Sequence, residues 1–328
     1  MTDSTSAPAR RRLMLLACAV LTAPAIAHAE AFPSKPITLI VPWPAGGSTD
    51  RHLRALAEIA GKHLGQNVIV ENKTGANGAI GAAAVAQASD EYSMLLSDMS
   101  ALAINTVMSK DMAYKPEQLG GATMLAYSPH LLATHPQFPA NTLAELVEQS
   151  KKKPIAIASS GIGSANHLGA VEIALATGMK FVHVPFRGGS QSIADVAAGN
   201  TQLVLNGMLA TLPLVQSGRL KVIGVSKRTR MALLPDVPTI AEQGVKDFET
   251  GTYQGVAVPA AMSKAVVSKL AAALIKVIRD PDMRARLAAA GAEVMTSSPK
   301  ETTDFLGTEA KRWSGLIQRA GAQLEGNA

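Results

Sequence analysis

Cysteine and aromatic residues are scarce in this chain of 328 residues, and each scarcity excludes a class of site. The one cysteine is Cys18, which lies in an N-terminal apolar stretch that we expect to be removed. A mature chain without cysteine can hold no disulfide, no thiolate metal site and no cysteine nucleophile. Because aromatic residues make up only 4% of the chain, we expect no surface on which nucleic-acid bases stack.

Long apolar runs and dense charge are also missing from the expected mature chain. The formal net charge is +6, and the one dense basic run after the N-terminal segment is Lys151 to Lys153. We expect this run to end a helix, where cations complement the helix dipole. The sequence therefore predicts a soluble folded protein with no nucleic-acid partner.

The N-terminus has the pattern of a secretory signal. Three arginines, Arg10 to Arg12, precede an apolar stretch that is too short to span a membrane, and small residues follow at Ala27 and Ala29. This is the order of a signal peptide. We expect residues 1–29 to be removed by cleavage near Ala29 and the mature chain to reach the periplasm. The pattern leaves open a general secretory or a twin-arginine route.

Strand and helix patterns alternate from Ile37 onward and predict an α/β fold. "ITLIV", "NVIVE" and "SMLLS" read as strands separated by two helical stretches, the first of which ends at Gly65. Such a βαβαβ order predicts a parallel sheet covered by helices. A second series of strands begins near Tyr127, and the C-terminal part reads as mainly helical.

No flexible linker separates the two strand series, so we expect the chain to cross between two lobes more than once. We place the crossings near Ala126 and Thr252. The predicted division puts residues 30–126 and 253–328 in the first lobe and residues 127–252 in the second.

The loop "PAGGSTD" after the first strand has the composition of an anion site. Gly46 and Gly47 leave backbone N–H groups unshielded, and the following helix directs its positive end to the same place. Ser48 and Thr49 can donate from their hydroxyls, whereas Asp50 is expected to cap the helix. The alternative is a capped turn that binds nothing.

The loop "SSGIGSANHL" repeats this composition after a strand of the second series. Gly161 and Gly163 precede a helix that begins near Ser164. Two facing helix N-termini could hold both ends of a diacid. Ser164 could equally serve only as an N-cap, and we expect His167 to bond locally in the first helical turn.

Two further polar residues follow later strands. Arg187 in "VPFRGG" is a candidate charge partner for a carboxylate, or a surface arginine in a turn. Asn206 in "LNGM" could donate its amide to the same ligand, or satisfy the end of a strand.

Enzyme motifs are poor. "GIGSAN" lacks the third glycine of a dinucleotide fingerprint, "GGSQS" fails as a nucleophile elbow, and the seven histidines have no paired spacing for zinc. We therefore expect no catalytic residue, no metal and no cofactor.

Several segments, taken together, resemble one family along almost the whole expected mature chain. They are "FPSKPITLIVPWPAGGSTD", "LGQNVIVENKTGANGAIGAAAVAQA", "LAIN", "GSANHL", "VHVPFRGG" and "LLPDVPTIAEQG". Their order and spacing are similar to those of the Bug-type periplasmic substrate-binding receptors of tripartite tricarboxylate transporters. The resemblance implies an α/β, two-lobed periplasmic binding protein of the type II flytrap class, with two mixed or parallel sheets and helices on both faces.

The resemblance also implies which loops hold the ligand. In one lobe it implicates Gly46, Gly47, Ser48, Thr49 and Asp50, with Ser97 and Asp98 in a further lining loop. In the other lobe it implicates Ser160, Gly161, Ser164, Asn166 and Asn206. Asp98 stands where the family often has a small or hydroxylic residue, and Asn206 stands where an acid is common, so the ligand of a relative cannot be transferred to this chain.

The function that we expect is that of an exported, monomeric receptor. It would bind a small di- or tricarboxylate between two lobes and deliver the acid to the membrane subunits of a transporter. Two alternatives stay open at the level of the sequence: an exported α/β enzyme that acts on an anionic substrate, and a ligand receptor that serves a sensor kinase.

Overall fold

The first three strands form the parallel sheet that the sequence predicts. The structure, a computed structural model, describes residues 32–45, 48–109, 111–321 and 324, so the predicted signal peptide lies outside the described residues. The strands, here called the first strand group, are β1 (Ile37–Val41), β2 (Val68–Asn72) and β3 (Ser93–Asp98). Both β2 and β3 pair with β1 in parallel. The intervening helices are α2 (Ser48–Leu64), the short 3₁₀ turn η2 (Ala76–Gly78) and α3 (Ala79–Ala86).

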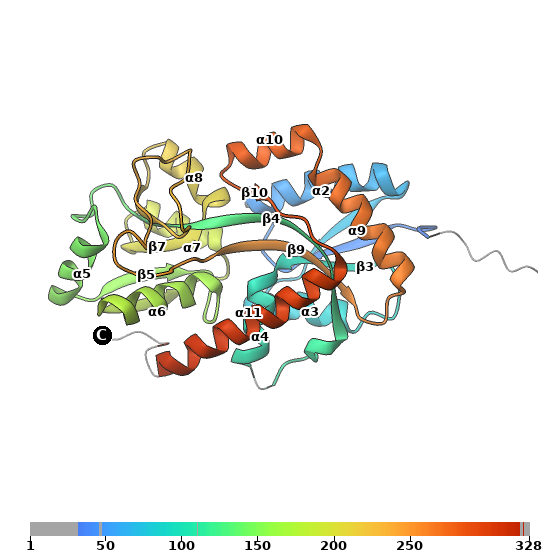
Figure 1. The fold of residues 1–328 in the computed structure, drawn as a ribbon, viewed down its shortest axis with the longest axis horizontal. Helices are drawn as coiled ribbons and strands as arrows, with labels where there is room; N and C mark the ends of the chain where they lie inside the picture. Colours follow the sequence, from blue (N-terminus) through green and yellow to red (C-terminus); the bar gives the residue numbers. More distant parts are fainter. Residues whose placement is uncertain (1–31, 46–47, 110, 322–323, 325–328) are drawn as a thin grey trace, which may run out of the picture.

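Two long strands carry the chain from one end of the molecule to the other. They are β4 (Leu119–Thr134) and β9 (Gly251–Pro259), which pair with each other in antiparallel fashion. Figure 1 shows them side by side through the middle of the molecule. The first part of β4 pairs with β9, and its last five residues pair with β7 and β8. A continuous strand order, β2-β1-β3-β9-β4-β7-β5-β6, therefore links both ends.

The second strand group lies beyond this pair. It consists of β5 (Ile155–Ser159), β6 (Phe181–Pro185) and β7 (Leu203–Gly207), in which β5 pairs in parallel with both neighbours. The nearby strand β8 covers Lys221–Val225. The helices of this part are α5 (Leu143–Lys152), α6 (Ala165–Thr177), α7 (Gly189–Ala197) and α8 (Met208–Gln216).

Several elements are not predicted by the sequence patterns. One is helix α4 (Met99–Met108), which begins directly after Asp98, where we expect a loop. The short turn η3 (Pro116–Gln118), which precedes β4, and helix α8 are two more. Strand β9 is another, since we expect the C-terminal part to be mainly helical. That expectation holds from Lys264 onward. The elements there are α9 (Lys264–Ile278), α10 (Pro281–Ala289), the two-residue strand β10 (Glu293–Val294) and α11 (Pro299–Ala320).

Residues next to the helix ends define where the helices begin and end. Ser298 and Glu301 form a reciprocal capping box, and Pro299 is the first residue of α11. Gly178 ends α6 with φ 72°, a left-handed conformation that glycine adopts without a steric penalty.

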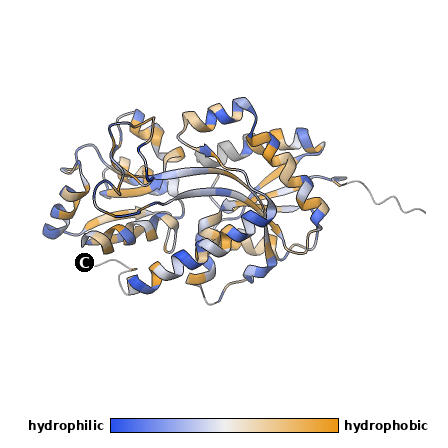
Figure 2. Cartoon of the chain, viewed as in Figure 1, coloured by the Kyte–Doolittle hydropathy of each residue, from blue (hydrophilic) through white to orange (hydrophobic). Residues whose placement is uncertain are grey.

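Helix α11 binds the two ends of the molecule together. Its Trp313 is 1% exposed and packs with Ile104 of α4 and Leu168 of α6, which belong to different ends of the sheet. Figure 1 shows α11, α4, α3 and α6 below the two long strands, with α2, α8 and α10 above them, so helices cover both faces. Hydrophilic and hydrophobic residues alternate along these outer helices in Figure 2, as expected for helices with one buried face.

None of the helices in the described part of the chain is long and apolar enough to cross a membrane.

Candidate functional site

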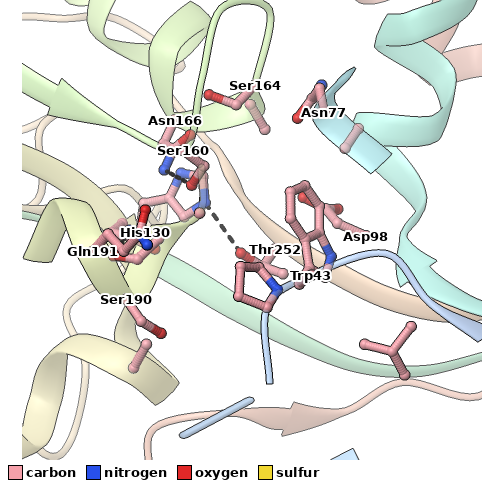
Figure 3. Close-up of a pocket in the computed structure, with 18 of the residues that line it drawn as sticks. Trp43, Asn77, Asp98, His130, Ser160, Ser164, Asn166, Ser190, Gln191 and Thr252 are labelled. Atoms are coloured by element: carbon pink, nitrogen blue, oxygen red, sulfur yellow. Dashed lines mark hydrogen bonds between the residues drawn. The ribbon is translucent and has the colours of Figure 1, made fainter. Parts of the chain in front are cut away.

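A cavity of about 420 Å³ lies between the first and second strand groups. It opens where β1, β3, β5 and β7 end and where α4, α6 and α7 begin, the edge at which α/β proteins bind ligands. Its volume falls in the usual range for small-molecule sites. Among its lining residues, Figure 3 labels Trp43, Asn77, Asp98, His130, Ser160, Ser164, Asn166, Ser190, Gln191 and Thr252.

Ser160 and Asn166 form one wall of the cavity. Ser160 follows β5 directly, and Asn166 lies in the first turn of α6. The Asn166 amide donates to Ser160 Oγ at 2.8 Å, a bond that Figure 3 marks with a dashed line. Because the hydroxyl oxygen of Ser160 accepts this bond, its hydrogen is available for an acceptor inside the cavity.

The N-terminus of α7 faces the same space. Its cap residue, Gly188, has no side chain that could accept from the first turn, and Gly189, Ser190 and Gln191 all line the cavity. A Cβ atom at Gly189 would lie 2.7 Å from Asn206 Nδ2, so this close approach requires glycine. The positive end of α7 is therefore open to a bound group, an arrangement that suits an anion.

Two predicted donors are already occupied by the protein. Ser164 caps α6, accepts from His167 N at 3.3 Å and donates to Gly161 O at 2.6 Å. The Asn206 amide nitrogen donates to Gly189 O at 3.2 Å and to Ser192 Oγ at 3.3 Å. Both side chains line the cavity, yet their hydrogens serve to hold the starts of α6 and α7 in place.

Asn77 joins the two sides of the cavity. Its backbone has φ 49°, in the left-handed region that asparagine tolerates better than most residues. Its Nδ2 donates to Gly163 O across the cavity and to Asn105 Oδ1, both at 3.1 Å. At the mouth, a Cβ at Gly188 would lie 3.3 Å from Pro44, so the segments after β1 and before α7 also approach closely.

His130 lies where β4 passes between the two strand groups. Nδ1 is 3.0 Å from Thr250 Oγ1 and Nε2 is 3.4 Å from Thr252 Oγ1. Burial lowers the pKa of His130 to about 3, and the nearby Arg312 acts in the same direction. His130 is therefore a neutral polar group at pH 7.

Asp98 is the buried N-cap of α4. Its Oδ1 accepts from Ser100 N and from Tyr253 N, both at 3.1 Å. Burial raises the pKa of Asp98 to about 7, because loss of water outweighs the backbone hydrogen bonds from Tyr253, Ser100 and Ala101, and the nearby Glu309 carboxylate adds to the shift.

The lining has little charge for a site that could hold an anion. Among the lining side chains that the structure describes, none belongs to lysine or arginine, and Asp98 is the one carboxyl. Across the described residues, no group of three or more His, Cys, Asp or Glu side chains is arranged to hold a metal ion. Recognition here would rest on N–H and O–H donors and on helix dipoles.

The structure brings part of the predicted site together. Asp98, Ser160, Ser164, Asn166 and Asn206 line the cavity. Ser97, Gly161 and Arg187 do not; Arg187 is exposed, and its backbone N–H donates to Gln191 Oε1 at 3.2 Å. Gly46 and Gly47 lie outside the described residues. Ser48, Thr49 and Asp50 are the first three residues of α2, without described side chains. A role for these residues in ligand binding stays a prediction.

Several lining residues were missed by sequence reasoning. Ser190 and Gln191 directly follow "VPFRGG" at a helix start, so the signal used for the other two loops could have found them. His130 and Thr252 come from β4 and β9, and their meeting depends on a long-range pairing that no local pattern reveals.

His167 behaves as predicted. Its Nδ1 accepts from Gly163 N at 3.1 Å within the first turn of α6, while its Nε2 lies 2.8 Å from Leu324 O. The side chain therefore holds the loop and the C-terminal segment, and it does not line the cavity.

A mixed sheet with a ligand-sized cavity between two strand groups is the architecture of a periplasmic binding protein. Among solved structures, the periplasmic binding protein BugD is 32% identical with a TM-score of 0.83, covering 88% of this chain and 99% of that chain. This confirms the predicted fold class.

The chain belongs to the TctC family, described as "Tripartite tricarboxylate transporter family receptor", whose sequence profile matches residues 52–322. The family consists of solute receptors and not of enzymes, as predicted.

Two related structures hold carboxylic acids. An R. palustris protein with adipate is 27% identical, with a TM-score of 0.83 and coverage of 88% of this chain and 98% of that one. MatC from Rhodopseudomonas palustris with bound malate is 26% identical, with a TM-score of 0.82 and coverage of 87% and 100%.

Proposed function

We propose that this chain is an exported, monomeric receptor that binds a small organic carboxylate in the cavity and delivers it to a tripartite tricarboxylate transporter. Residues 1–29 would direct export to the periplasm and be removed near Ala29. Residues 30–126 with 253–328, and residues 127–252, would act as the two lobes that close on the ligand.

The open N-terminus of α7 is the observation that carries the proposal. A carboxylate placed there would accept from backbone N–H groups at the positive end of the helix and from the free hydrogen of Ser160. Ser190 and Gln191 line the same place and can add further donors. Such a site neutralises an anion without a cationic side chain, which agrees with the lining.

Closure of the two lobes would follow from contacts on both sides of the cavity. Asn77 already donates to Gly163 across it, and Pro44 lies against Gly188 at its mouth. A ligand that contacts both lobes stabilises the closed form relative to the open one by the free energy of those added contacts.

The carboxylate-bound relatives support this choice of ligand class. They share the fold over almost their whole length and hold dicarboxylic acids of four and six carbons. The family description supports the choice of partner, because it names receptors of tripartite tricarboxylate transporters.

Substitution of Ser190 tests the carboxylate site while keeping the fold. In Ser190→Asp, an added carboxylate at the start of α7 favours the helix and repels a bound anion. Titration calorimetry with malate, succinate, adipate and citrate should show at least one acid that binds the wild type. We expect that acid to lose at least about 30-fold in affinity in Ser190→Asp. The neutral, similarly shaped Ser190→Asn should lose far less.

Equal loss in both variants would contradict an anion site at α7, and binding of none of the four acids by the wild type would contradict the proposed ligand class. Delivery has its own test. Uptake of the bound acid by vesicles that contain the transporter's membrane subunits should require this receptor, and receptor-independent uptake would contradict that role.

A further inference from the structure

Asp98 places a carboxyl group in the lining of a cavity that we propose to bind acids. Of the described side chains that line it, this carboxyl is the one that can carry a negative charge. It is 9% exposed and stands at the start of α4, opposite the wall that Ser160 and Asn166 form. Figure 3 shows it beside Trp43 and Asn77, on the other side of the cavity from Ser190 and Gln191.

One oxygen of Asp98, Oδ1, accepts the two hydrogen bonds that hold this side chain. Oδ1 accepts from Ser100 N and Tyr253 N, both at 3.1 Å, and the backbone N–H of Ala101 adds a weaker interaction with the carboxyl. All three donors are backbone groups, and in the described part of the chain no side chain donates to Asp98. Oδ2 accepts neither of the two bonds at 3.1 Å, so it keeps the capacity to accept from a donor that enters with the ligand.

The charge of Asp98 is not balanced by the protein. The charged group that acts on it is Glu309 of α11, which opposes its ionisation, while Tyr253 of β9 contributes a backbone N–H that carries no charge. Glu309 itself is held by Ser100 Oγ at 2.6 Å and by Trp313 Nε1 at 2.8 Å. Across the cavity, His130 is neutral at pH 7. A buried carboxylate without a cation gains most from a ligand that supplies a donor or a positive charge.

Capping of α4 alone would not require an aspartate at position 98. Serine, threonine and asparagine cap helices about as well, and the exposed N-cap Asp280 of α10 shows the same capping geometry far from the cavity. A capping role alone gives no reason to place a carboxylate inside a pocket for acids, where it repels a second carboxylate of the ligand.

We propose that Asp98 makes the cavity select acids that carry a hydroxyl or ammonium group beside a carboxylate over the corresponding plain dicarboxylates. The α7 end would take one carboxylate, and Asp98 Oδ2 would accept from the hydroxyl or ammonium group. This inference rests on the proposed carboxylate-binding function and narrows its ligand class.

Matched pairs of acids test this selection in the wild type. The pairs are succinate with malate, succinate with aspartate, glutarate with 2-hydroxyglutarate, and adipate with 2-hydroxyadipate, titrated calorimetrically at pH 8. We expect at least one substituted acid to bind about tenfold or more tighter than its plain partner, as for one hydrogen bond to a charged group. Equal binding, or tighter binding of the plain acid in every pair that binds, would overturn the inference.

The variant Asp98→Asn tests whether Asp98 causes the preference for the substituted acids. It keeps the shape and the cap while it replaces the acceptor Oδ2 with a donor. We expect the preference to fall below about threefold, while the plain acids bind as well as before or better. Asp280→Asn, the matched cap outside the cavity, should keep the wild-type preference, and Asp98→Ser serves if Asp98→Asn does not fold.

An unchanged preference in the folded Asp98 variants would overturn the role of Asp98 while leaving carboxylate binding intact. If no acid of any pair binds the wild type, the proposed function itself fails and the selection falls with it.

Discussion

Replacement of His130 by glutamine is expected to change how the stability of the receptor depends on pH. His130 is 2% exposed, and its pKa falls from 6.5 in the unfolded chain to about 3 in the folded protein. Between these values the unfolded chain binds the proton and the folded protein does not, so stability is lost as the pH falls below 6.5. At pH 4.5, two pH units below the unfolded value, this loss amounts to about 3 kcal/mol.

This loss of stability affects the wild type but not His130→Gln, because glutamine has no imidazole to bind the proton. At pH 7.5 the variant should be less stable by about 1–3 kcal/mol, because glutamine cannot restore both contacts to Thr250 and Thr252. From pH 7.5 to pH 4.5 the difference should move by about 3 kcal/mol in favour of the variant. The other buried histidines contribute equally to both proteins and cancel in the difference.

Urea unfolding of the ligand-free proteins, followed by fluorescence across this pH range, measures the difference directly. His63→Gln is the matched control, since His63 is exposed on α2 and its imidazole meets water in both states. Stability curves of wild type and His130→Gln that run parallel from pH 7.5 to 4.5 would refute the burial of a neutral His130.

Three further predictions concern the cavity and its supports. Relative to wild type, Asp98→Asn should gain about 4 kcal/mol of stability as the pH rises from about 4 to about 7. The reason is that the raised pKa of Asp98 makes its ionisation unfavourable in the folded wild type. Urea unfolding that shows no such trend would contradict this. Asn77→Gly keeps the left-handed backbone and removes the hydrogen bond to Gly163. The variant should increase the radius of gyration of the ligand-free protein in solution scattering. An unchanged radius would argue against a role of Asn77 in closure. Trp313→Ala should lower the free energy of unfolding by about 3–5 kcal/mol, because it empties a buried site and removes the indole that donates to Glu309. A loss below about 1 kcal/mol would contradict the packing of Trp313 in the core.

The sequence predicts those parts of the fold that depend on local patterns. Short apolar runs that alternate with helical patterns identify β1, β2 and β3 and predict their parallel pairing. Capping signatures place the start of α11 at Pro299. Such signals work because strand burial and helix ends are decided by residues within a few positions of each other.

The parts that escaped prediction depend on contacts between distant segments. Strand β9 pairs with β4 across more than a hundred residues, and this pairing brings Thr252 to His130. The sequence placed Asp98 near the site but could not show its burial, which comes from α4, α11 and β9 packing around it. For Arg187 the sequence left open a ligand contact or a surface turn, and the structure places this residue in an exposed turn outside the lining of the cavity.

A crystal structure of the receptor with the tightest-binding acid of the panel would show directly whether the start of α7 holds a carboxylate. We expect one carboxylate within hydrogen-bond distance of the first N–H groups of α7 and of Ser160 Oγ, with the two lobes closed around it. An acid bound outside this cavity, or one whose carboxylates face solvent or a cationic side chain instead of the start of α7, would contradict this expectation.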